Sequence, residues 1–93
     1  MTNIFETLPE TLDCPKCGLE LTHQHQVEIF CRQEDGQQSS RLIDLHTGKI
    51  TDGTGNNPSA RRQGIRVYMR CESGCDFSLN IYQHKGFTCL DYD

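Results

Sequence analysis

The sequence predicts a mostly β domain: a small antiparallel sheet of about five strands, with a long polar loop and little or no helix. Apolar and polar residues alternate in several stretches, which is the periodicity of β-strands. No stretch has the three- to four-residue apolar spacing of an ordinary helix. Two pairs of closely spaced cysteines lie far apart along the chain, and they indicate a cross-link between distant segments, through disulfides or a bound metal.

The composition leaves few apolar residues for a core. The chain has 93 residues, enough for one domain, of which 34% are hydrophobic, and it has no tryptophan. Because chains this short bury a modest fraction of their surface, we expect disulfides or a structural metal to supplement the core. We divide the chain into a lead-in over 1–13 and a single domain over 14–93 that carries an inserted loop at 52–64.

The first half of the domain predicts two strands and a short return strand. Residues 26–32 alternate between apolar and polar side chains and form the first predicted strand. An Asp-Gly pair inside 34–40 is a hairpin signal. Residues 41–51 then give a short strand, a Thr-Gly turn and a stub of return strand.

The second half predicts a loop followed by three strands. Residues 52–64 contain no apolar residue except Ala60, and their Gly and Pro content is typical of a loop. Residues 64–71 alternate again. Residues 76–92 give two more strands, joined by a turn at Lys85 and the glycine that follows it.

The sequence predicts neither secretion nor membrane insertion. Its first residues include no basic residue ahead of an apolar run, and no stretch approaches the length of a transmembrane helix. We therefore expect a cytoplasmic protein with no membrane contact. Thiols stay reduced in that compartment, so paired cysteines there usually bind metal.

The motifs CPKCG (14–18) and CESGC (71–75) supply two cysteine pairs. A Cys-x-x-Cys turn directs two sulfurs at one point, and a structural zinc ion takes four such ligands in a tetrahedron. The second turn is one residue longer, and Gly74 can absorb the extra length. The sequence predicts a structural Zn²⁺ site, with free thiols or a disulfide pair as the alternative. Its ligands would be Cys14, Cys17, Cys71 and Cys75.

These motifs resemble those of the zinc β-ribbon family, small sheet domains in which two cysteine turns on neighbouring hairpins clamp one zinc ion. The resemblance covers about ten of the 93 residues and implies a zinc-ribbon-like fold. The chain departs from the family pattern in the longer second turn and in the 53 residues that separate Cys17 from Cys71. Family members bind nucleic acids, proteins or nothing known, so the resemblance implies the fold more firmly than the function.

Two further cysteines, and the first two of the four histidines, are candidates for a second site. Cys31 and Cys89 continue the apolar rows of their strands, and we expect them to pack in the core as small hydrophobes. A second metal site or a redox pair is the alternative for them. His23 and His25 alternate at the start of a strand, where exposed polar positions are favoured over ligands of a second metal.

The outward face of the strands within 65–84 is predicted to bind a partner. Cationic and aromatic side chains interleave there, and on a sheet they can stack bases and contact phosphates. A solvated face is the alternative, because Arg and Tyr are also good strand formers. The residues predicted to bind nucleic acid or another partner are Arg61, Arg62, Arg66, Tyr68, Arg70, Tyr82, His84 and Lys85.

These features favour a binding module over an enzyme. The net charge of -4 opposes a general phosphate-binding surface, so contact with nucleic acid would come from this basic side alone. We expect a module that binds nucleic acid or a nucleic-acid-associated protein, with a protein–protein adaptor or regulator as the alternative. Four thiolates leave a zinc ion no open position for a substrate, so we do not expect an enzyme. The sheet edges are a candidate surface for a homodimer.

Overall fold

The computed structural model describes residues 10–93, and these form a single antiparallel sheet of six strands without a helix. The mostly β prediction is confirmed for this part of the chain. About five strands were expected, and the sixth is the short return strand. The predicted lead-in over 1–13 lies mostly outside the described residues. The strands are β1 (Thr22–Cys31), β2 (Ser39–Asp44), β3 (Ile50–Asp52), β4 (Gly64–Cys71), β5 (Asp76–His84) and β6 (Phe87–Tyr92).

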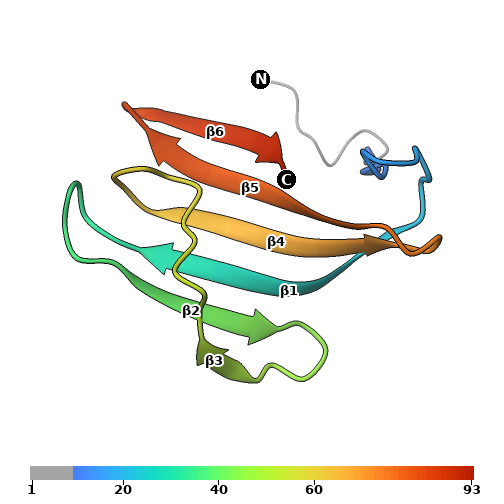
Figure 1. Cartoon of the computed structure of the whole chain (residues 1–93), viewed down its shortest axis with the longest axis horizontal. Coiled ribbons are helices and arrows are strands. Elements are labelled where there is room, and N and C mark those ends of the chain that lie inside the picture. Colours follow the sequence, from blue (N-terminus) through green and yellow to red (C-terminus); the bar gives the residue numbers. More distant parts are fainter. Residues whose placement is uncertain (1–9) are drawn as a thin grey trace.

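The strand order is β3-β2-β1-β4-β5-β6, with β1 and β4 in the centre (Figure 1). Hairpins join β1 to β2, β2 to β3, β4 to β5 and β5 to β6. The connection from β3 to β4 is different, because residues 53–63 leave the outer strand and run back across β2 and β1 (Figure 1). This crossing segment is most of the loop predicted at 52–64.

The predicted turn at Lys85 is a tight two-residue hairpin between β5 and β6. Lys85 has φ 49° and Gly86 has φ 82°, so both residues are left-handed. Two left-handed central residues define a type I′ turn, whose twist matches that of the flanking strands. The turn therefore fixes the register of β6 against β5, with His84 opposite Phe87.

One face of the sheet is apolar along its whole width. One row of apolar cross-strand neighbours passes through all six strands. A second row passes through β1, β4, β5 and β6. The described residues cover this face mainly at one end, so side chains on the outer strands stay exposed, Ile50 by 61% and Leu90 by 67%. The first row consists of Ile50, Ile43, Val27, Val67, Leu79 and Tyr92, and the second of Ile29, Ile65, Ile81 and Leu90.

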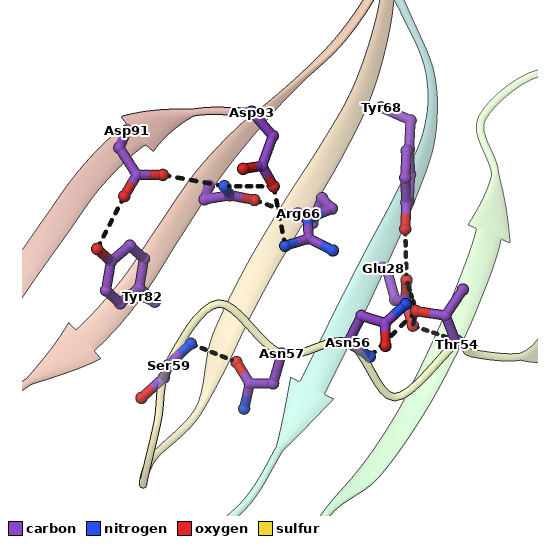
Figure 2. A network of polar contacts seen from close by, with 11 residues as sticks. Glu28, Thr54, Asn56, Asn57, Ser59, Arg66, Tyr68, Tyr82, Asp91 and Asp93 are labelled. Atoms are coloured by element: carbon purple, nitrogen blue, oxygen red, sulfur yellow. Dashed lines mark hydrogen bonds and ion pairs between the residues drawn. The ribbon is translucent and has the colours of Figure 1, made fainter.

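The opposite face is polar, yet it holds some of the most deeply buried side chains. Phe30 and Glu28 are 1% and 0% exposed, and Asn80 is 2% exposed. The crossing segment of residues 53–63 lies over β1 and excludes solvent there (Figure 2). The polar face that we expected to point outward is therefore partly interior.

The crossing segment is tied to the sheet by the carboxylate of Glu28. Glu28 accepts hydrogen bonds from the backbone N–H groups of Thr54 and Gly55, from the hydroxyl of Thr54, and from the hydroxyl of Tyr68 at 2.7 Å (Figure 2). The approach is so close that a Cβ atom on Gly53 would lie 2.5 Å from Oε2 of Glu28. Glycine at this position thus allows the backbone to reach the carboxylate.

Our expectation that Cys31 packs in the core is wrong. Cys31 is exposed, and Cys89 is partly buried opposite Tyr82 on the polar face, so neither lies in the core. Cys31 ends β1 on the apolar face, beyond the part of that face that the described residues cover. Residues 10–93 contain no helix of the length and apolarity that a bilayer crossing requires.

The Glu28 contacts generate a stability prediction. Replacing Glu28 with alanine leaves two backbone N–H groups and the Tyr68 hydroxyl without their acceptor in a buried site. We expect Glu28→Ala to lower the free energy of unfolding by about 3 kcal/mol. Urea denaturation of the metal-loaded protein measures this change.

The matched control is Glu20→Ala, which removes an exposed carboxylate. We expect that variant to differ from the parent by less than about 0.5 kcal/mol. Equal stability of the Glu28 and Glu20 variants would show that the buried carboxylate does not hold the crossing segment.

Candidate metal centre

The topology brings the two cysteine turns to the same end of the sheet. The first turn directly precedes β1, and the second connects β4 to β5. Because β1 and β4 are antiparallel neighbours, Thr22 at the start of β1 lies opposite Cys71 at the end of β4. A backbone hydrogen bond of 3.0 Å from Glu72 N–H to the carbonyl of Leu21 extends this pairing to the turns.

Each cysteine turn is closed by a backbone hydrogen bond that a glycine N–H donates. Gly18 donates to the carbonyl of Cys14 at 2.8 Å, and Gly74 donates to the carbonyl of Cys71 at 3.0 Å. Both glycines are left-handed, with φ 77° and 96°. The positive φ of Gly74 fits the expectation that this residue absorbs the longer spacer.

The four cysteine sulfurs gather at one point. All four Sγ atoms lie within 4.8 Å of one another, and those of Cys17 and Cys71 are 3.7 Å apart. A tetrahedral ion with metal–sulfur bonds of about 2.3 Å needs sulfurs about 3.8 Å apart. Cys14, Cys17, Cys71 and Cys75 are thus placed as a set that could hold a metal ion.

Burial divides the cluster into an inner and an outer pair. Cys14 and Cys71 are 2% and 1% exposed, while Cys17 is exposed and Cys75 intermediate. The inner pair packs with Met69 and Phe77 in the apolar cluster at this end of the sheet. The cysteines are therefore part of the core as well as a donor set.

Hydrogen bonds prepare part of the cluster for the thiolate form. The hydroxyl of Ser73 lies 3.0 Å from Sγ of Cys71 and 3.3 Å from Sγ of Cys17. The Ser73 hydroxyl lowers the pKa of Cys71 to about 6 and also lowers the pKa of Cys17. The neighbouring sulfur of Cys71, followed by that of Cys17, raises the pKa of Cys75 to about 11. Without metal the cluster would therefore keep a proton on Cys75 at neutral pH.

The donor set itself limits the metal. Thiolates are soft ligands, which suit zinc, copper(I) and iron–sulfur centres rather than magnesium or calcium. In the part of the chain from residue 10 onward, these four cysteines are the one group of side chains placed to hold a metal ion. His23 and His25 do not form such a group, and His23 instead lies 3.7 Å from a carboxylate oxygen of Glu72.

The structure separates the eight residues predicted to bind a partner into two groups. In four of them the polar group already bonds a carboxylate of the same chain, on the polar face or beside the cysteine turns. Arg66 pairs with Asp93 at 3.1 Å, and Arg70 pairs with Asp76 at 2.8 Å. The hydroxyl of Tyr68 donates to Glu28, and the hydroxyl of Tyr82 donates to Asp91 at 2.8 Å (Figure 2).

The other four predicted residues meet at the opposite end of the sheet. Arg61, Arg62, His84 and Lys85 line a hollow of about 220 Å³ between the crossing segment and the β5–β6 turn. We call it the basic hollow. The carboxylate of Glu34 also lines it and lies 3.4 Å from Arg61.

Both arginines of the basic hollow have carboxylate partners, and Arg62 lies 3.8 Å from Glu34. Arg61 is held by Asp35 through a contact of 2.6 Å, which lowers the pKa of Asp35 through the hydrogen bond. Nε of Arg62 is buried without a hydrogen-bond partner in the structure. Exposed ion pairs of this kind stabilise the folded state by only about 0–1 kcal/mol. An incoming anion can therefore replace the carboxylate in such a pair.

Sequence reasoning missed several residues that shape these sites. The Ser73 hydroxyl lies within hydrogen-bond distance of two cysteine sulfurs. Its position between two cysteines of the sequence could have predicted that contact. Glu28 and Asn80 gave no signal, because polar residues in alternating strands normally face solvent. The burial of Glu28 follows from the crossing segment, and Asn80 is enclosed by its contacts with Arg66, Asp91 and Asp93. No local pattern predicts either arrangement.

Comparison with known proteins found no matching family model, no matching curated protein and no matching solved structure. The metal centre and the basic hollow are therefore interpreted from their own geometry.

The cysteine cluster predicts that the fold depends on metal. We expect one zinc ion per chain and a melting temperature that falls by about 10 °C or more when a strong chelator removes it, because bound metal stabilises the folded state. Native mass spectrometry gives the stoichiometry, and thermal unfolding with and without chelator gives the shift.

Matched cysteine variants control this experiment. Cys14→Ser should lose the metal, while Cys31→Ser, which changes an exposed thiol outside the cluster, should keep it. A metal-free protein that melts cooperatively at the same temperature in chelator would contradict the predicted centre.

Acid should release the metal. Cys75 has a raised pKa of about 11, so it must lose a proton on binding metal at any pH from 6 to 9. We expect affinity to fall by at least about tenfold for each pH unit of acidification. Below about pH 6 Cys71 also becomes protonated, and the fall should steepen. Competition with a chromophoric chelator at several pH values measures this slope, and a flat profile would count against thiol ligation.

Proposed function

We propose that this chain is a small zinc-binding module in which Cys14, Cys17, Cys71 and Cys75 hold a structural Zn²⁺ ion. The observation that carries the proposal is the convergence of four sulfurs within 4.8 Å from two turns of the chain. Zinc is the usual occupant of a closed four-thiolate site. The arrangement resembles a zinc ribbon, although the first cysteine turn precedes β1 rather than joining two strands.

The proposed zinc ion serves the fold and not a reaction. Four protein ligands complete its tetrahedron and leave no position for water or a substrate. The ion would join residues 14–18 to the β4–β5 turn beside the apolar cluster, which contains two of its ligands. We therefore propose a binding protein rather than an enzyme, and a cytoplasmic one, because reduced thiols are needed to bind the metal.

Nucleic acid, or a protein associated with it, is the proposed partner, and the basic hollow is the proposed contact. The cationic side chains of Arg61, Arg62 and Lys85 converge there, together with the imidazole of His84. Guanidinium groups offer several donors to phosphate oxygens, and the ion pair of Arg62 with Glu34 is long, at 3.8 Å. The sheet face around Tyr68 and Arg66 supports this proposal less, because their polar groups already bind carboxylates.

A protein–protein adaptor is the second candidate, and the apolar face favours it. Four of the side chains in the two apolar rows, and one beside them, are large and clearly exposed. Exposed contiguous apolar surface on a small protein usually marks an interaction site. These side chains are Ile50, Ile65, Leu90 and Tyr92, with Leu45 beside them at the end of β2.

The basic hollow predicts salt-sensitive binding of nucleic acid that depends on Lys85. We expect Lys85→Asn to weaken binding about three- to tenfold at low salt and to reduce the salt slope by about 1. Asparagine suits the left-handed backbone of residue 85, so the turn is retained. Fluorescence anisotropy with labelled single- and double-stranded DNA and RNA at two salt concentrations measures the change.

Lys49→Asn is the matched control, because it removes the same charge from the exposed turn between β2 and β3. This control should bind as the parent does. Absence of salt-sensitive binding, or an equal effect of the two substitutions, would remove the nucleic-acid proposal and leave the adaptor. Neither result would affect the zinc centre, which is measured separately.

A further inference from the structure

The strand β6 is an outer strand, and no strand within residues 10–93 pairs with its outer side. It closes the strand order at one end of the sheet and pairs with β5 alone among the described strands. Its six residues form a continuous ladder without a register shift. An outer strand of this kind presents a row of free N–H and C=O groups that can pair with another strand.

The hydrogen bonds at the chain's end show which backbone groups of β6 are free. Asp93 and Ser78 exchange both of their backbone hydrogen bonds, at 2.9 and 3.2 Å. In an antiparallel ladder such pairs recur at every second residue, so Asp91 and the alternate residues before it also face β5. The tight Lys85–Gly86 turn agrees, because a two-residue hairpin is closed by a pair of this type. The N–H and C=O groups of Thr88, Leu90 and Tyr92 therefore point away from the sheet.

The side chains of β6 do not protect this edge. Natural edge strands are blunted by charged residues, proline, bulges or short length, and the one charged residue of β6, Asp91, is bonded to Asn80 and Tyr82 of the neighbouring strand. Phe87, Leu90 and Tyr92 are instead 70%, 67% and 47% exposed. The opposite edge is short, since β3 has three residues and continues into the crossing segment. The two edges of the sheet are thus unlike, and β6 is the open one.

We propose that β6 pairs with β6 of a second copy of this chain, antiparallel and centred on Leu90. In this register Leu90 lies opposite Leu90 of the second copy, and Thr88 lies opposite Tyr92. All three open residues of each strand then find an open residue across the dyad, which gives six new backbone hydrogen bonds. The two sheets become one, with their apolar faces on the same side.

Neighbouring registers that keep the faces aligned are less favourable. A centre at Cys89 leaves Tyr92 opposite Gly86 in the turn of the second copy, beyond the end of the strand. A centre at Asp91 places two Asp91 carboxylates directly opposite each other, which is destabilising. The centre at Leu90 sets Asp91 opposite Cys89, and each Asp91 already accepts hydrogen bonds from Asn80 and Tyr82 of its own chain. The strand is therefore complementary to itself, which favours a second copy over an unrelated strand.

Sedimentation of the full-length, zinc-loaded protein over a wide concentration range tests the proposal. We expect twice the mass of one chain at high concentration and dissociation on dilution. Leu90→Lys places two like charges opposite each other at the dyad and should give a monomer throughout. Ile50→Lys is the matched control, because Ile50 is 61% exposed on the other outer strand, and this variant should dimerise as the parent does.

Cross-linking then tests the register. In a background with Cys31→Ser and Cys89→Ser, Leu90→Cys should form an intermolecular disulfide on mild oxidation, because the paired Cα atoms would lie about 5.5 Å apart. Phe87→Cys in the same background should not form it. Zinc content and circular dichroism confirm that each variant is folded.

Three results would overturn the proposal. The parent could stay monomeric at every concentration, which would leave the β6 edge to a different strand. Leu90→Lys could dimerise as the parent does, or Ile50→Lys could dissociate equally. The protein with Cys89 intact and Leu90 unchanged could cross-link faster than the Leu90→Cys variant, which would place the dyad at Cys89 instead.

Discussion

The convergence of four cysteine sulfurs at one end of the sheet is the constraint on which the rest of this structure depends. Cys14 comes before the first strand and Cys71 ends the fourth, yet both pack into the same small apolar cluster with Met69 and Phe77. A chain in which 34% of residues are hydrophobic has little else with which to attach residues 10–21 to the sheet. A metal ion at this point would replace missing core with coordinate bonds, as in other small domains.

The two faces of the sheet are stabilised in different ways. On the polar face, a buried carboxylate holds the crossing segment through backbone and hydroxyl donors (Figure 2). A buried charge is tolerated when several donors satisfy it, and Glu28 has four such contacts from three residues. The apolar face is less enclosed by residues 10–93, and its outermost side chains are those most available to a partner.

Candidate functions are consequently distributed around the sheet rather than gathered in one cleft. The cysteine cluster occupies one end, and the basic hollow occupies the other, beside the β5–β6 turn. The open edge of β6 runs between these two ends. The same turn that fixes the β6 register carries Lys85 into the basic hollow, so pairing of two chains through β6 would bring two such hollows into one assembly.

Local patterns in the sequence determined the strands, the turns and the two cysteine pairs, because alternation, left-handed glycines and cysteine spacing are properties of short segments. The tertiary structure decided what covers each face. It buried Glu28 under residues 53–63, engaged Arg66 and Tyr68 with carboxylates, and left Cys31 exposed at the end of its strand. The first outcome depends on where a connection of irregular backbone crosses the sheet and the others on which strands lie side by side, and no periodicity encodes either.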